Sequence, residues 1–151
     1  MALPDCFESQ EIEALLARLA ALEPGTSARW GKMDAAQMLA HCCTPYLQIQ
    51  GEAGGGPALL RFIARTFFKG AVVGEAPFKQ NVPTPKVFVV SDAREFRTEQ
   101  ERLSALIRSV HGQGAAAFEG RVHVTFGALS AREWSNLLWK HLDHHLRQFG
   151  G

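Results

Sequence analysis

The chain has 151 residues, 46% of them hydrophobic and 21% charged, so it can bury a core and is not a disordered polypeptide. Its formal net charge of +1 argues against nucleic-acid binding, which requires a strongly basic face. No stretch approaches the roughly 20 apolar residues that span a bilayer, and residues 1–13 do not form a secretory signal. We therefore expect one cytoplasmic domain, residues 1–151, that binds neither nucleic acid nor membrane.

Apolar residues at helical spacing predict a first helix over residues 9–22, with Ser9 as its N-cap. A second helix is predicted over residues 32–50, where Asp34 and Gln37 have the spacing of a capping box. Pro45 interrupts this second pattern, because its ring nitrogen cannot donate a hydrogen bond to the carbonyl four residues earlier. Either the helix ends near Thr44, or it continues and bends.

A short extra helix is predicted over residues 57–69, followed by a proline-rich loop over residues 74–92 in which "KVFVV" is briefly extended. Helices are also predicted over residues 92–112 and 130–150, joined by a long connection. The last helix opens with a capping box formed by Ser130 and Glu133. Four principal helices, one short extra helix and long connecting loops predict an all-α four-helix bundle.

The basic residues of the short helix, Arg61, Arg65 and Lys69, recur every four positions and are accompanied by three phenylalanines. Such a stripe is more often a solvated face than a binding site for a partner or an anion. The short helix and the segment "RTFFKGAVV" (65–73) nevertheless carry more apolar surface than one bundle must bury. We therefore expect a homodimer.

The last helix carries three of the six histidines within "KHLDHHLRQF" (140–149). At about 100° per residue, His145 falls in the apolar sector, His141 lies at its edge, and His144 lies on the polar side beside Lys140 and Arg147. Asp143 projects opposite His145. His141 and His145 are one turn apart and can chelate one metal ion, for which His41 in the second helix can supply a third nitrogen. The alternative is an incidental cluster on a weakly basic tail, and the residues alone leave both interpretations open.

Three segments carry a family resemblance: "RWGKMDAAQMLAHC" (29–42), "NVPTPK" (81–86) and "FGALSAREWSNLLWKHLDHHLRQFG" (126–150). The chain resembles the DinB/YfiT-like superfamily, and more closely a branch of it described only as a domain of unknown function. The resemblance implies an up-down-down-up four-helix bundle that holds a divalent metal, often nickel or zinc, with His41, His141 and His145. One departure is "HVTFG", where the branch tends to have a proline after His123; this histidine lines the mouth of the site or is an ordinary loop residue.

Three neutral imidazoles leave a metal ion with its full charge and with open coordination positions. The resemblance implies a metal-dependent enzyme, such as a thiol-dependent transferase or a hydrolase acting on a small molecule. Asp34, Gln37 and Gln48 share a helix stripe with His41 and are candidates for contacts around the metal or the substrate. A non-catalytic binding protein that keeps the bundle is the alternative function.

Overall fold

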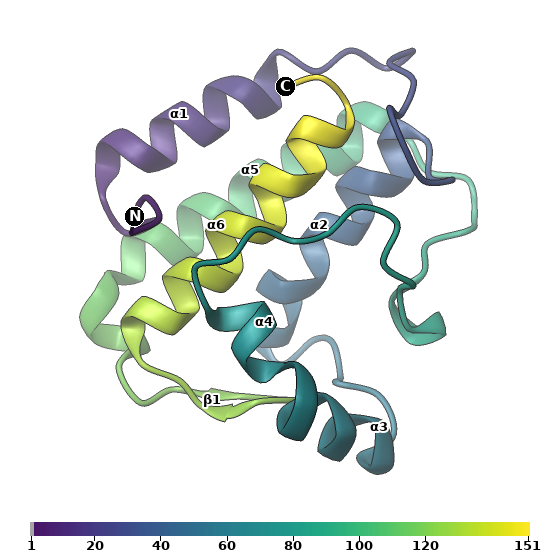
Figure 1. Cartoon of the computed structure of the whole chain (residues 1–151). Coiled ribbons are helices and arrows are strands. Elements are labelled where there is room, and N and C mark those ends of the chain that lie inside the picture. The colour runs from purple at the N-terminus through teal and green to yellow at the C-terminus, as the bar shows by residue number, and fades with distance from the viewer. Residues whose placement is uncertain (1) are drawn as a thin grey trace.

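The computed structural model describes residues 2–151 and is mostly helical (Figure 1). Its four long helices are α1 (Ser9–Ala20), α2 (Ala35–Gln50), α5 (Phe96–Gln113) and α6 (Ala131–Gln148). Helix α2 packs against both α5 and α6, and α1 contacts the same two helices. Their apolar faces meet in one continuous core that includes Leu19, Leu39, Leu103 and Leu142. Within residues 2–151, every helix is too short or too polar to cross a bilayer.

The two predicted capping boxes are confirmed, because Asp34 pairs reciprocally with Gln37 at the start of α2 and Ser130 with Glu133 at the start of α6. The predicted cap at Ser9 is wrong. Ser9 is the first residue of α1, and Glu8 precedes it without a side-chain cap. Helix α2 continues through Pro45 to Gln50, which excludes a helix that ends near Thr44.

The short extra helix is longer than predicted. It comprises α3 (Ala58–Ile63), a π-helical turn η1 (Ala64–Phe68) and α4 (Lys69–Val73). The contacts with α6 come mainly from α4, and α3 and η1 protrude at the bottom of the molecule in Figure 1.

The loop after α4 runs across α6 and then α2 in Figure 1, and contains the 3₁₀ turn η2 (Lys86–Phe88). The prediction of an extended "KVFVV" is therefore wrong at residues 86–88. The physical reason is Pro85, whose φ of −53° starts a turn that closes when the Phe88 amide donates to the Pro85 carbonyl at 2.8 Å.

The connection before α6 contains more structure than the sequence predicted. It begins with the 3₁₀ helix η3 (Ala115–Phe118) and continues into a small antiparallel hairpin, in which β1 (Val122–His123) pairs with β2 (Gly127–Ala128). His123 is buried in this hairpin, and its Nδ1 accepts hydrogen bonds from the backbone amides of Thr125 and Phe126 at 3.0 and 3.2 Å. The ring packs against Trp134, with centroids 5.1 Å apart. His123 thus serves as a structural residue of the hairpin.

Burial lowers the pKa of His123 to about 4. Between this value and the usual pKa of about 6.5, the unfolded chain binds a proton at His123 that the folded chain does not, so the free energy of unfolding falls as pH falls. We predict that His123→Asn, which keeps a hydrogen-bond acceptor but cannot titrate, makes the loss of stability between pH 7 and pH 4.5 smaller by about 2 kcal/mol. Urea unfolding at the two pH values measures this difference, and an unchanged loss would contradict it.

Candidate metal centre

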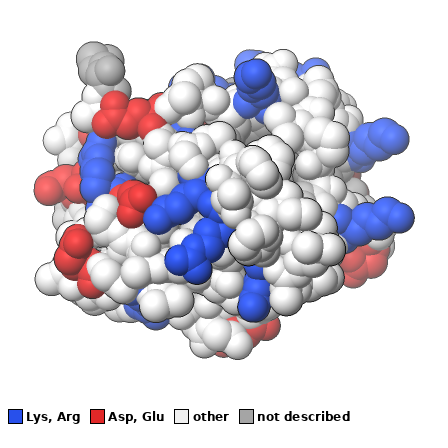
Figure 2. Space-filling model, turned by 60° about the horizontal axis from the view of Figure 1, so that its bottom comes forward, with Lys and Arg blue, Asp and Glu red and all other residues white. Residues whose placement is uncertain are grey.

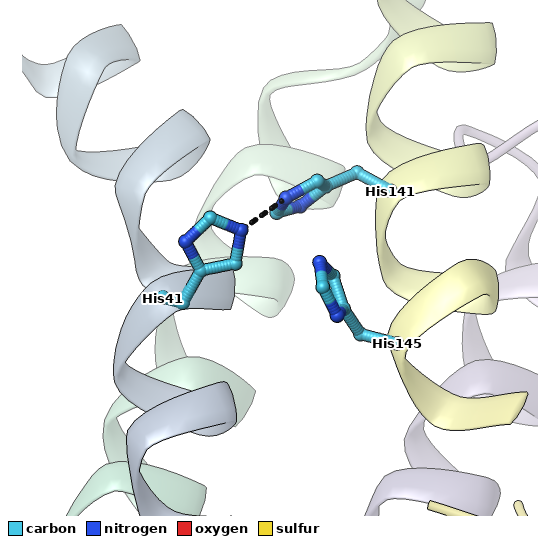
Figure 3. Close-up of side chains that lie close together, drawn as sticks. All are labelled: His41, His141 and His145. Carbon is cyan, nitrogen blue, oxygen red and sulfur yellow. Dashed lines mark hydrogen bonds between the residues drawn. The ribbon is translucent and has the colours of Figure 1, made fainter. Parts of the chain in front are cut away.

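Three histidines converge between α2 and α6, as Figure 3 shows. His41 comes from the middle of α2, whereas His141 and His145 come from successive turns of α6. The centroids of the three rings are 4.9 Å from one another in every pair, and one nitrogen from each ring lies within 4.8 Å of the others. The structure therefore brings together the three residues that the sequence proposed as ligands.

The orientation of the His41 ring is set by the loop before α5. Its Nδ1 lies 3.0 Å from the carbonyl oxygen of Phe88, which can only accept a hydrogen bond. The Nδ1 atom of His41 must therefore carry the proton, and Nε2 must carry the free lone pair. That lone pair faces His141, whose Nε2 lies 3.0 Å away.

The His145 ring is oriented by Gln148, one turn further along α6. The Gln148 side chain donates from Nε2 to the carbonyl of Trp30 at 2.6 Å, so its Oε1 is left as an acceptor. This oxygen lies 2.7 Å from Nδ1 of His145 and holds the proton there. The lone pair of His145 is therefore also on Nε2, the nitrogen on the side of the other two rings.

The segment before α2 is shaped to admit this glutamine. Gly31 has a φ of +82°, and a Cβ atom at this position would lie 2.6 Å from Nε2 of Gln148. Only glycine combines this backbone conformation with so close an approach. The backbone amide of Arg29 also donates to the Gln148 carbonyl at 2.8 Å, so residues 29–31 hold the end of α6 in place.

His141 differs from the other two rings in the position of its proton. Because Nε2 of His41 is an acceptor, the hydrogen bond between the two rings requires the proton on Nε2 of His141. To bind a metal through Nε2, His141 has to move that proton to Nδ1. It is therefore the one ring of the three whose tautomer must change.

All three rings are neutral at physiological pH. Burial lowers the pKa of His41, lowers that of His145 to about 3, and lowers that of His141 well below its usual value. Repulsion between the neighbouring imidazoles lowers the pKa values of His141 and His145 further. Neutral imidazole is the form that ligates a metal, so protons do not compete strongly for this cluster.

The spacing of the nitrogens suits a small transition metal. Bonds of about 2.0–2.1 Å in a tetrahedral arrangement place two ligand nitrogens about 3.3 Å apart. The distance of 3.0 Å between Nε2 of His41 and Nε2 of His141 is a few tenths of an ångström shorter than this. Small ring rotations can bring Nε2 of His145 within bonding distance of the same ion. The donor set, three imidazoles without a carboxylate, suits zinc or nickel and would leave a coordination position open.

The side chains predicted to surround the site lie elsewhere. Asp34 and Gln37 form the helix cap, and Gln48 donates to the carbonyl of Gly54 at 3.0 Å. Asp143, which the same wheel places opposite His145, pairs with Arg18 at 2.8 Å. The hydrogen bonds of these side chains are thus made away from the three histidines.

His144 stays outside the cluster, as the helical projection predicted. It is half-buried, and its ring lies edge-on to Trp30 and Phe78, with centroids 5.5 and 5.9 Å away. These three rings line a cavity of about 300 Å³ on the outer side of α6, and none of the three converging histidines lines it. This cavity beside α6 is thus not part of the histidine cluster.

Lys140 is buried, although the helical projection placed it on the polar side of the last helix. It is only 3% exposed, and its Nζ donates to the carbonyls of Ala71 and Ala76 at 2.8 and 2.9 Å. Burial lowers its pKa to about 8. Lys140 therefore ties α4 and the following loop to α6.

Gln148 is the residue that sequence reasoning missed. The sequence could have indicated its proximity to His145, since it lies three residues further along the same helix. Its partner, the Trp30 carbonyl, is 118 residues away in the sequence and could not be paired with it by spacing.

The chain belongs to the family described as "Protein of unknown function (DUF1569)", which it matches over residues 5–150. Searches of the curated proteins and of the solved structures gave no match. Membership agrees with the predicted domain of unknown function, whereas the wider DinB/YfiT-like relationship stays a prediction.

We predict that Gln148→Met weakens the binding of zinc by about 10- to 100-fold, the usual effect of removing a residue that orients a metal-bound histidine. The substitution keeps the length of the side chain but leaves the Nδ1 proton of His145 without its acceptor. Gln48→Met is the matched control, because this glutamine bonds to Gly54 away from the cluster. Calorimetric zinc titration measures both variants, and equal affinities would contradict the assigned role.

Proposed function

We propose that the protein binds one divalent transition metal, zinc or nickel, through Nε2 of His41, His141 and His145. The observation that carries this proposal is the pair of hydrogen bonds made by Nδ1 of His41 and of His145 to carbonyl oxygens. In metal sites, a ligating histidine almost always donates its other ring proton in this way. An incidental cluster has no need for two rings whose free lone pairs are turned towards a third.

The proposed activity is that of a metal-dependent enzyme, a transferase or hydrolase acting on a small molecule, with a thiol as one suitable substrate. When bound, the ion would act as a Lewis acid that lowers the pKa of a water or thiol at its open position. The three histidines would hold the ion without adding negative charge, so its full positive charge would be available to a substrate. The Phe88 and Gln148 oxygens would keep the ligand rings in orientation.

The fold proposed with this function is the up-down-down-up four-helix bundle of the DinB/YfiT-like proteins. The packing of α2 and α1 against both α5 and α6 supports it. So does the position of the three histidines, because a bundle of this kind builds its metal site from side chains on facing helices.

A second candidate function is non-catalytic binding, and one observation favours it. The three-histidine group contains no aspartate, glutamate or cysteine, so it brings no general base of its own. A protein that keeps the metal for structure, or that binds a partner through another surface, would need none.

We predict that the protein without a histidine tag binds zinc and nickel with a stoichiometry of one. Each of His41→Ala, His141→Ala and His145→Ala should weaken this binding by more than about 100-fold, since losing a ligand costs more than losing a residue that orients one. His144→Ala is the matched control on the same helix, and it should bind as the parent does because its ring faces Trp30 and Phe78. Calorimetric titration of the four variants measures the effects.

Two results would contradict the proposal. If all four variants bound metal like the parent, the cluster would not be the site. If His144→Ala lost binding while His145→Ala kept it, the assigned orientation of α6 would be wrong. A bound metal with no activity towards thiols or esters would leave the non-catalytic function as the better one.

A further inference from the structure

The protruding helix of the molecule, α3 with η1, buries none of its side chains. Its large apolar residues are all exposed, by 37% to 73% of their surface. They are Leu59, Leu60, Phe62, Ile63, Phe67 and Phe68. From the sizes of these side chains, they expose on the order of 700 Å² of apolar surface, which exceeds the largest patch of a typical monomer. A helical segment this short is marginal in water, so a partner that covers its exposed apolar side chains would stabilise it.

The basic stripe of this helix faces the body of the same molecule. Lys69 lies 3.7 Å from Glu133 at the start of α6. The Arg65 guanidinium lies close to Gly127 in the hairpin, and the Arg61 side chain lies close to Gly55. The basic side chains thus contact the protomer on one side of the helix, although Arg65 stays exposed, and the large apolar side chains are turned to solvent.

A groove lies beside the apolar side of α3. It is formed by Pro57 and Leu60 together with the loop that carries Pro83, Pro85 and Val87, and its volume is about 500 Å³. Val87 is itself 55% exposed. One face of the molecule thus has an apolar ridge, formed by the phenylalanines, next to an apolar groove. The face at the bottom of Figure 1 is largely uncharged in Figure 2, with basic side chains at its centre and most acidic ones towards its border.

We propose that this face, α3–η1 with the adjoining groove, is the interface of a two-fold homodimer. In such an interface the same patch meets itself, so the ridge of each protomer can enter the groove of the other. The exposed apolar area of α3–η1 is close to the area that a stable dimer needs, because a standard interface buries about 800 Å² on each partner.

A membrane surface is the other environment that could cover an apolar helix, and the arrangement of charges favours it less. Helices that lie in the headgroup region reach anionic lipids with a basic face that is free to do so. Here Lys69 is engaged by Glu133 and Arg61 lies against the loop before α3, so Arg65 is the one exposed cation of the three. A groove bounded by prolines also offers a rigid shape that suits a protein side chain better than a fluid lipid.

Sedimentation equilibrium of the metal-free protein tests this proposal independently of the metal site. We expect a dimer at micromolar concentration. Phe67→Glu and Leu60→Glu should each raise the dissociation constant at least tenfold, because each would bury a charge in an apolar interface. Both residues are exposed in the protomer, so the helical circular dichroism signal should be unchanged. Val122→Glu is the control, since Val122 is 72% exposed but lies on β1, outside the proposed interface.

The salt dependence of self-association distinguishes a dimer interface from a membrane-binding surface. Each protomer brings Arg61 and Arg65 to this face with no acidic residue between residues 53 and 74, so screening their repulsion should tighten the dimer as sodium chloride is raised. A monomer at 100 µM would overturn the proposal. A monomer that binds phosphatidylglycerol vesicles through Phe67 and is released from them by salt would also overturn the proposal. That result would assign the face to a membrane.

Discussion

The candidate centre depends on two hydrogen bonds in which ring protons are held by carbonyl oxygens. Phe88 holds the proton of His41, and Gln148 holds that of His145. Without these acceptors, either imidazole could place its proton on Nε2 and turn its lone pair away from the cluster. With them, two lone pairs are directed to the place where a third ring lies, and binding a metal would require only His141 to change its tautomer.

These acceptors explain why segments distant in the sequence are shaped as they are. Pro85 starts the 3₁₀ turn that brings the Phe88 carbonyl to His41, and Gly31 leaves space for the Gln148 amide beside Trp30. Lys140 holds the end of α4 and the start of the long loop against α6 by donating to the carbonyls of Ala71 and Ala76. The loops are thus part of the site, although all three proposed ligands come from helices.

Much of the helical layout could be predicted from the sequence because the relevant interactions are local. Capping boxes at Asp34 and Ser130, the period of the apolar residues, and the one-turn spacing of His141 and His145 are all set within a few residues. The hairpin around His123 could not be predicted in this way. Its strands have two residues each, and the acceptor that organises its turn is a buried ring nitrogen and not a typical turn residue.

The same limit applies to the surroundings of the histidines. A helical wheel places Gln48 and Asp34 near His41 and places Lys140 in solvent. It uses only the residues of one helix and does not include the segments that cover α2 and α6. The structure instead gives the orienting roles to a backbone carbonyl and to a glutamine held from the other end of the chain.

The tautomers of the three rings provide the most direct test of the proposed metal centre. Long-range ¹H–¹⁵N NMR spectra distinguish a ring protonated on Nδ1 from one protonated on Nε2. In the metal-free protein, the account predicts a proton on Nδ1 of His41 and His145 and on Nε2 of His141. On adding one equivalent of zinc, all three rings should carry the proton on Nδ1, with the Nε2 signals shifted by ligation. Mixed tautomers at His41 and His145 without metal, or spectra that zinc leaves unchanged, would contradict the account.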